Sequence, residues 1–234
     1  MFRFKQFSVD QIGCAMKINT DGVLLGAVAN ADNPQNILDI GTGTGVIALM
    51  LAQKFLSAQI DAVEIDTAAA QTAERNFANS PFARRLTLFP QSFEEYSNAY
   101  PGKKYDLIIS NPPFYINSLN SPKAGKALAK HTDSDFFEGL IAEISKHLRE
   151  DGLCWLILPL PTAELVKLHA AGYGLYTQQN MLIRSFAIDI PHREIICLGF
   201  EKMSAELFNL TIYNEPKVYS ADYKKLLQPY FLAF

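Results

Sequence analysis

The sequence predicts an α/β fold with a mostly parallel sheet flanked by helices. From Gln35 onward, short apolar runs alternate with amphipathic stretches, which is the pattern of successive right-handed βαβ units. Hydrophobic residues make up 49% of the 234 positions, so a packed core is within reach of a chain of this length. We expect one domain over residues 1–234, with residues 1–33 as an N-terminal extension.

The individual elements follow from apolar periodicity. Buried strands are expected at 36–40, 59–64, 86–89, 105–110 and 153–158, each a short apolar run. Helices are expected at 46–55, 67–79 and 136–148, with Thr67 as the N-cap of the second. Residues 117–133 are polar and rich in Ser, Gly and Lys, so we expect a long loop there, of a kind that often carries function.

Composition and charge narrow the class of protein. The net charge of −3 argues against broad, unspecific binding of nucleic acid, although a local basic face stays open. No apolar run is long enough to span a bilayer and residues 1–7 lack the core of a signal peptide, so we expect a cytoplasmic protein. Cys14, Cys154 and Cys197 lack metal-ligand spacing, and the last two are expected to be buried, reduced thiols.

A glycine-rich turn follows the first expected strand. Gly41, Gly43 and Gly45 give the spacing G-x-G-x-G, and glycine lets a backbone turn tightly and approach a ligand closely. A dinucleotide-binding turn would need its last glycine where Val46 stands. The spacing therefore suits a ligand with an adenosine and an amino-acid tail, and we count Asp39, which opens the turn, with the glycines as cofactor-binding. A turn without any ligand is the alternative.

An acidic residue closes the second expected strand. Glu64 lies roughly twenty residues beyond the glycines, the distance typical of a ribose-binding acid. Its carboxylate can accept hydrogen bonds from both ribose hydroxyls. Asp66 is the second candidate for this role, but we favour a helix cap or an exposed loop position for it.

The tetrapeptide Asn111, Pro112, Pro113 and Phe114 directly follows the fourth expected strand. Two consecutive prolines fix the backbone and remove two donors, which leaves carbonyl groups free to point into a cleft. The aromatic ring that follows can stack on a planar group. Alone, this sequence is also an ordinary proline-rich turn. Because it comes after the glycine turn and Glu64, we predict that these four residues form a catalytic site.

Together these features resemble the amino-group methyltransferases of the Rossmann-like class, whose tetrapeptide has the form Asn/Asp-Pro-Pro-aromatic. The resemblance implies S-adenosylmethionine as the cofactor and an amino group as the acceptor. An adenine amino nitrogen is a poor nucleophile because its lone pair is delocalised into the ring. The Asn111 side-chain oxygen and the Pro112 carbonyl can accept its two hydrogens and favour a more pyramidal nitrogen. Such a protein mainly aligns the reacting atoms, and no strong general base is needed.

The resemblance extends over nearly the whole chain. The chain resembles a bacterial family that methylates N6 of the adenine next to the anticodon of a valine tRNA. The resemblance lies in segments 4–7, 15–27, 39–41, 110–114, 158–159, 191–193 and 219–223. This implies a single class I methyltransferase domain with a mixed, mostly parallel seven-stranded sheet. The resemblance also places Lys17, Thr20 and Asp21 over the cofactor pocket. Without it, we would interpret Lys17 and Asp21 as an ordinary pair of charged surface residues. Asn111 is counted with the cofactor-binding residues as well.

One position departs from the family. Relatives carry an acidic residue after the third strand that accepts from the adenine amino group of the cofactor, and Ser92 holds that place here. A serine hydroxyl can still accept a hydrogen bond, without charge assistance. The departure bears on the strength of cofactor binding and not on the reaction.

The substrate side is expected to bind a single-stranded tRNA loop. Its adenine can be turned out of the stack at a cost of roughly a few kcal/mol or less, and Phe114 is the candidate stacking face. The expected RNA-binding residues are basic: Arg3, Lys5, His192 and Arg193, with Lys123, Lys126, Lys130 and His131 as further candidates. Each is also compatible with ordinary surface solvation. We expect tRNA as the partner, no membrane, no metal and a monomer without an obligate protein partner.

Three other functions share parts of this pattern. Protein methyltransferases that act on a glutamine amide use a similar tetrapeptide, but commonly carry a separate N-terminal helical domain, for which the residues before 36 leave no room. DNA adenine methyltransferases usually add a target-recognition domain. A non-catalytic RNA-binding module that retains the fold is the third, and the intact tetrapeptide argues against it. No zinc or catalytic-triad pattern is found, and His147 and His169 are expected to be structural.

Overall fold

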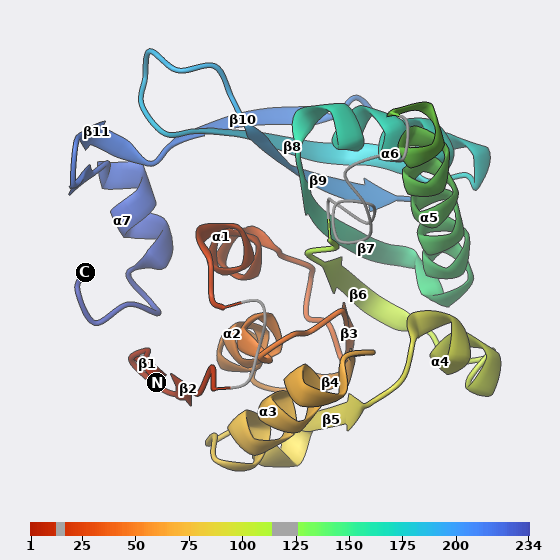
Figure 1. The fold of residues 1–234 in the computed structure, drawn as a ribbon, viewed down its shortest axis with the longest axis horizontal. Coiled ribbons are helices and arrows are strands. Elements are labelled where there is room, and N and C mark those ends of the chain that lie inside the picture. The colour runs from red at the N-terminus through yellow and green to blue at the C-terminus, as the bar shows by residue number, and fades with distance from the viewer. Residues whose placement is uncertain (13–16, 114–125) are drawn as a thin grey trace.

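An eight-stranded sheet in the order β10-β8-β9-β7-β6-β3-β4-β5 organises the chain (Figure 1). The computed structural model describes residues 1–12, 17–113 and 126–234, without the side chains of 126–133. The strands are β3 (Asn36–Ile40), β4 (Gln59–Val63), β5 (Leu86–Phe89), β6 (Tyr105–Ser110), β7 (Leu148–Leu158), β8 (Tyr176–Arg184), β9 (Arg193–Gly199) and β10 (Glu206–Thr211).

The sheet is mostly parallel, as predicted. Strand β9 runs antiparallel to both of its neighbours, β7 and β8, and the other pairs are parallel. Among the described residues, this sheet has eight strands, one more than the seven that the family resemblance implies, because β10 adds to the edge beside β8. Strand β7 also begins earlier than expected, at Leu148, which pairs with Tyr105 before the register shifts. A Cβ at Gly152 would lie 2.9 Å from the Tyr105 carbonyl oxygen, so this close approach needs glycine.

Helices cover both faces of the sheet and enclose two apolar cores. One face is covered by α1 (Thr20–Val28), α2 (Val46–Lys54), α3 (Thr67–Ala78) and α7 (Ala221–Leu227), and the other by α4 (Phe93–Ala99), α5 (Lys126–His147) and α6 (Leu160–Gly172). A 3-10 turn, η1 (Ala83–Arg85), precedes β5. Cys154 and Cys197 are buried free thiols, as expected, and belong to opposite cores.

Other expected boundaries are corrected as well. Helix α5 begins at Lys126, so residues 126–133 are helical and not part of a long loop. The N-cap of α3 is Asp66 and not Thr67, because the Asp66 carboxylate accepts a hydrogen bond from the Ala69 amide. The strand expected at 59–64 ends at Val63, which leaves Glu64 just beyond it.

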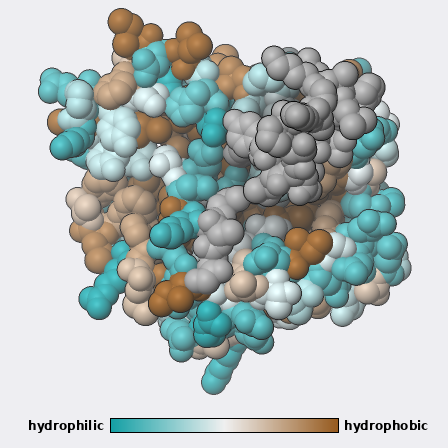
Figure 2. Space-filling view, in the orientation of Figure 1, coloured by the Kyte–Doolittle hydropathy of each residue, from teal (hydrophilic) through white to brown (hydrophobic). Residues whose placement is uncertain are grey.

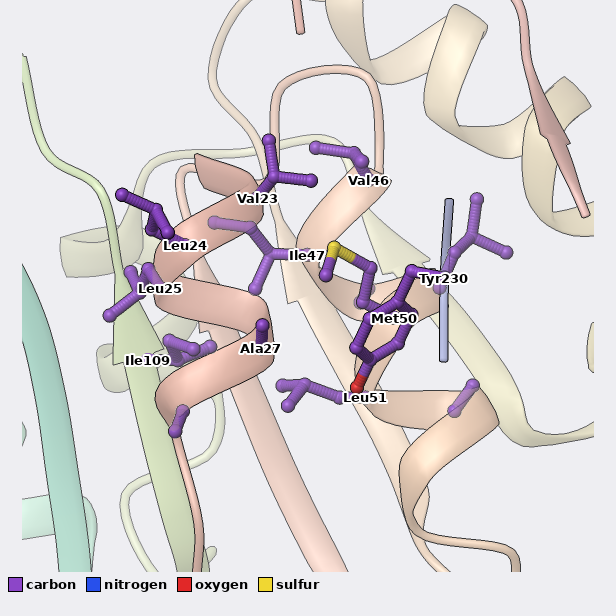
Figure 3. Close-up of a cluster of buried hydrophobic side chains, with 14 of the residues drawn as sticks. Val23, Leu24, Leu25, Ala27, Val46, Ile47, Met50, Leu51, Ile109 and Tyr230 are labelled. Carbon is purple, nitrogen blue, oxygen red and sulfur yellow. The ribbon is translucent and has the colours of Figure 1, made fainter. Parts of the chain in front are cut away.

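The N-terminal extension contributes a buried helix to the core. Side chains of α1 interlock with those of α2 above β6 (Figure 3). A Cβ at Gly26 would lie only 3.0 Å from the Met50 sulfur, so glycine lets the two helices approach closely. The indole of Trp155 and the ammonium of Lys54 donate to backbone carbonyls at the C-terminal end of α1. Burial lowers the pKa of Lys54 to about 8. Helix α1 is therefore an integral part of the fold.

The two ends of the chain lie beside each other (Figure 1). Phe4 forms an isolated bridge with Phe231, and the Lys5 ammonium donates to the carbonyls of Gln228 and Phe234. Two short two-stranded sheets complete the described strands, β1 (Phe2–Arg3) with β2 (Ser8–Val9) and β11 (Tyr213–Glu215) with β12 (Val218–Tyr219). Within the described ranges, no helix has the length and apolar character that crossing a membrane requires.

Candidate active site

The glycine turn at the end of β3 adopts a backbone that only glycine takes without strain. Gly41, Gly43 and Gly45 have φ values of 70°, 57° and 83°, in the left-handed region that L-residues avoid. A Cβ at Gly41 or Gly43 would meet no atom within 4 Å, whereas one at Gly45 would lie 2.5 Å from the Phe77 ring. The first two glycines therefore face open space where a ligand can approach, and the third packs on α3.

The Glu64 carboxylate holds this turn against the end of β4. It is 8% exposed. One of its oxygens accepts from the Gly43 amide at 2.8 Å and the other from the Asp66 amide at 2.8 Å. A carboxylate has about four acceptor sites, so Glu64 keeps capacity for further donors. Asp66 caps α3, which is the role that we favoured for it.

Asp39 lies fully buried beneath the turn. The Thr42 hydroxyl donates to its Oδ2 at 2.6 Å. Burial raises the pKa of Asp39 to about 7, although hydrogen bonds from Thr42 and from the Ala48 amide act in the opposite direction. Asp39 therefore ties the turn to the start of α2, and its charge depends on conditions near neutral pH.

Asn111 stands next to the glycine turn, because Ser110 pairs with Ile40 across β6 and β3. The Ser110 hydroxyl donates to the Ile40 carbonyl at 2.8 Å, which fixes the ends of the two strands together. The Asn111 amide nitrogen would lie 3.8 Å from a Cβ at Gly22, in the first turn of α1. Pro112 is buried, Pro113 is exposed, and Phe114 lies outside the described residues. The structure thus brings Asn111, the turn and the N-terminal extension to one edge.

Two charged residues far apart in sequence also meet at this edge. The Arg193 Nε donates to the Asp21 carboxylate at 2.8 Å, which joins the start of β9 to the first turn of α1. The neighbouring residues Lys17 and Thr20 are exposed. Lys17, Thr20 and Asp21 are the residues of the N-terminal extension that were expected over the cofactor pocket. Of these three, Asp21 is held in place by an ion pair.

Comparisons with known proteins identify the family. A family model described as the methyltransferase small domain matches residues 14–163. A relative from Pedobacter heparinus, named tRNA1(Val) (adenine(37)-N6)-methyltransferase, is 50% identical over 100% of this chain and 98% of its own length. A relative of the same name from Bacteroides thetaiotaomicron is 39% identical, over 99% and 97% of the two chains. The chain belongs to this methyltransferase family.

Solved structures agree on the fold of the methyltransferase. A protein described as a predicted O-methyltransferase from Agrobacterium tumefaciens superposes with a TM-score of 0.65 at 19% identity, covering 90% of this chain and 96% of that one. TrmN from Thermus thermophilus gives 0.58 at 18% identity, over 76% and 47% of the two chains. At these identities the likeness concerns the fold alone, which is that of class I methyltransferases.

Ser92 has a structural role that the sequence analysis did not assign to it. Its hydroxyl accepts from the Glu95 amide at 3.1 Å, while the Glu95 carboxylate accepts from the Ser92 amide at 2.8 Å. This reciprocal capping box begins α4, and these hydrogen bonds hold the pKa of Glu95 below its usual value. The pattern S-x-x-E, which predicts such a capping box, is present in the sequence at 92–95. Contact of Ser92 with the cofactor stays a prediction, and the hydroxyl would have to serve both purposes.

The basic residues that were expected to bind RNA, and whose side chains the structure describes, fall into two groups. His192 is exposed beside Arg193 at the edge that carries Asn111. Arg3 and Lys5 belong to the N-terminal segment that contacts the C-terminal one, and Lys5 is bonded there to two carbonyls. Lys123, and the side chains of Lys126, Lys130 and His131, lie outside the described residues. Of the basic side chains that the structure describes in these two groups, His192 and Arg193 are the ones that adjoin the candidate site.

Asn76 is a site residue that the sequence analysis missed. Its amide nitrogen donates to the Thr44 carbonyl of the glycine turn at 2.8 Å and to the Asp10 carbonyl at 3.0 Å. Its oxygen accepts from the Asp10 amide at 2.8 Å. Asn76 thereby joins the turn to the N-terminal extension. The sequence marked it only as a polar residue on the apolar stripe of α3.

Among the residues with described side chains, no group of three His, Cys, Asp or Glu could hold a metal ion.

Proposed function

We propose that the protein transfers a methyl group from S-adenosylmethionine to N6 of an adenine in tRNA, and that this adenine is number 37, beside the anticodon of a valine tRNA. The position of Asn111 carries the proposal, because it stands at the edge where the open glycine turn begins. The full-length relatives support the substrate, since their names specify tRNA1(Val) and adenine 37.

The residues around the turn fit the proposed cofactor. Gly41 and Gly43 leave space for it, and Glu64 is the acceptor for its ribose hydroxyls. Lys17, Thr20 and Asp21 would lie near its methionine end, at the start of α1. When bound, S-adenosylmethionine supplies a methyl group activated by a positively charged sulfur.

Asn111 and Pro112 orient and activate the adenine in this proposal. The Asn111 side-chain oxygen and the Pro112 carbonyl accept the two hydrogens of the amino group. This favours the pyramidal nitrogen of the transition state over the planar nitrogen of the free base, so the two acceptors act mainly on the rate. The proton that the product loses passes to solvent. The Phe114 ring would stack on the base and hold it in place.

Single-turnover methylation of tRNA by Asn111 variants tests the proposal. With both substrates saturating, Asn111→Ala should transfer the methyl group much more slowly than the parent, and this loss of rate should exceed any loss of tRNA or cofactor affinity. Asn111→Asp keeps an acceptor oxygen and should retain more of the rate. Equal rates for the parent and Asn111→Ala would exclude the role of Asn111. Label transferred to protein and not to tRNA would favour the glutamine-amide alternative.

A further inference from the structure

The loop between β8 and β9 exposes two large aliphatic side chains. Ile188 and Ile190 are 94% and 85% exposed, more than the other large hydrophobic residues of the described chain. Figure 2 shows hydrophobic atoms projecting at the upper left, where Figure 1 places this loop. Exposed apolar surface costs solvation free energy without helping the fold, so a pair of projecting isoleucines calls for another explanation.

Hydrogen bonds and packing hold the loop in a shape that directs these side chains outward. The Asp189 amide donates to the Phe186 carbonyl at 3.0 Å, and the Phe186 amide donates to the Asp189 carboxylate at 3.0 Å. The His192 amide donates to the Ile183 carbonyl at 2.9 Å and closes the loop at its base. The Phe186 ring packs 5.7 Å from the Tyr213 ring. The exposure therefore belongs to a built turn and not to a frayed one.

The loop lies at the edge of the sheet that carries the candidate site. Strand β8 is parallel to β6 and β7, because both β7 and β8 run antiparallel to β9. The end of β8 therefore faces the same way as the end of β6, which leads into Asn111. The first residue of β9, Arg193, reaches Asp21 in the first turn of α1, next to Gly22 and Asn111. The exposed His192 precedes Arg193 at this same edge.

We propose that Ile188 and Ile190 form an aliphatic wedge that inserts between bases of the RNA loop beside the target adenine. The inference rests on the proposed function. Turning an adenine out of its stack uncovers the apolar faces of its neighbours, and branched aliphatic side chains are suited to fill such a gap and keep the bases apart. Two isoleucines supply only a fraction of the ~800 Å² per partner that a stable protein interface buries, so the pair suits a wedge better than a docking surface.

The test compares the parent with the double variant Ile188→Ser/Ile190→Ser. Its substrate is a valine-tRNA anticodon stem–loop with 2-aminopurine next to the target adenine, because this base brightens when it unstacks. Leu56→Ser is the matched control, since Leu56 is 77% exposed between α2 and β4, at the opposite edge of the sheet. A second variant, Ile188→Leu/Ile190→Leu, keeps the aliphatic surface.

We expect the serine double variant to lose the rise in fluorescence and to lower kcat/KM for the stem–loop by roughly tenfold or more. Cofactor affinity and Tm should stay at parental values, and the leucine variant and Leu56→Ser should behave like the parent. Unchanged fluorescence and kcat/KM in the serine variant would overturn the wedge. So would a parent that sediments as a dimer and a serine variant that sediments as a monomer, because the isoleucines would then join two copies. Failure of the proposed function is a different result: the parent itself would not methylate the stem–loop.

Discussion

Alanine at Gly45 should mainly lower stability, whereas alanine at Gly43 should mainly lower cofactor affinity, although both glycines have positive φ. The left-handed backbone costs a non-glycine residue roughly 1–2 kcal/mol at either position. At Gly43 nothing else opposes the new methyl group, which would project into open space. At Gly45 the Cβ would lie 2.5 Å from the Phe77 ring. Overpacking of this kind adds roughly 1–3 kcal/mol, so the total at Gly45 is roughly 2–5 kcal/mol.

Thermal unfolding with and without S-adenosylmethionine separates the two effects. One kcal/mol corresponds to roughly 2–4 °C in Tm for a chain of this size, so Gly45→Ala should unfold roughly 4–20 °C below the parent. It should still be stabilised by the cofactor, because ligand binding to the folded state raises Tm. Gly43→Ala should lose less stability but most of the cofactor-induced rise, with affinity down roughly tenfold or more.

Either of two results would refute this reasoning. If Gly43→Ala bound S-adenosylmethionine as tightly as the parent in calorimetry, the open space at the turn would not be the cofactor site. If Gly45→Ala were as stable as Gly43→Ala, the contact with Phe77 would not limit the residue at that position.

Three further predictions concern charged residues. Glu64→Gln should weaken S-adenosylmethionine binding by about 1.5–3 kcal/mol in calorimetry, because charge-assisted hydrogen bonds are lost; unchanged affinity would remove Glu64 from the ribose site. Burial raises the pKa of Asp39 from 3.8 to about 7. Between these pH values the folded state keeps a proton on Asp39 that the unfolded state has lost, so the contribution of Asp39 to stability falls as pH rises through this range. Urea unfolding should therefore show the stability of Asp39→Asn rising relative to that of the parent as pH increases from 3.8 to about 7, and parallel profiles over that range would contradict the shift. Arg193→Gln should weaken tRNA binding and reduce the slope of log affinity against log salt concentration by about 1. The control Lys5→Gln should mainly lower Tm, because Lys5 donates to the carbonyls of Gln228 and Phe234. Equal slopes for Arg193→Gln and the parent would place the RNA elsewhere.

The central strands were predictable from sequence because their signals are local. The expected ranges for β3, β5 and β6 coincide with the observed strands, since each is a short apolar run between polar turns. The glycine turn, Glu64 and Asn111 were predictable for a related reason: parallel strands carry their carboxyl ends to one edge, so residues that follow such strands converge.

Features that depend on tertiary contacts were not predictable in this way. Helix α1 is buried along almost its whole length, so it lacks the amphipathic pattern that would mark a helix. Lys5 was expected at an RNA-binding rim, but contact between the chain ends decides its place. The edge strand β10 is largely exposed and has little apolar alternation, and pairing with β8 is what defines it.

Nucleoside analysis of methylated tRNA tests the central claim most directly. The protein would be incubated with labelled S-adenosylmethionine and tRNA that lacks the modification, and the product digested and mapped. We expect label in N6-methyladenosine at adenine 37 of valine tRNA, the base specified in the names of the relatives, and its loss with Asn111→Ala. Label in any other nucleoside would contradict the account, because the Asn111 and Pro112 acceptors would then serve a different group.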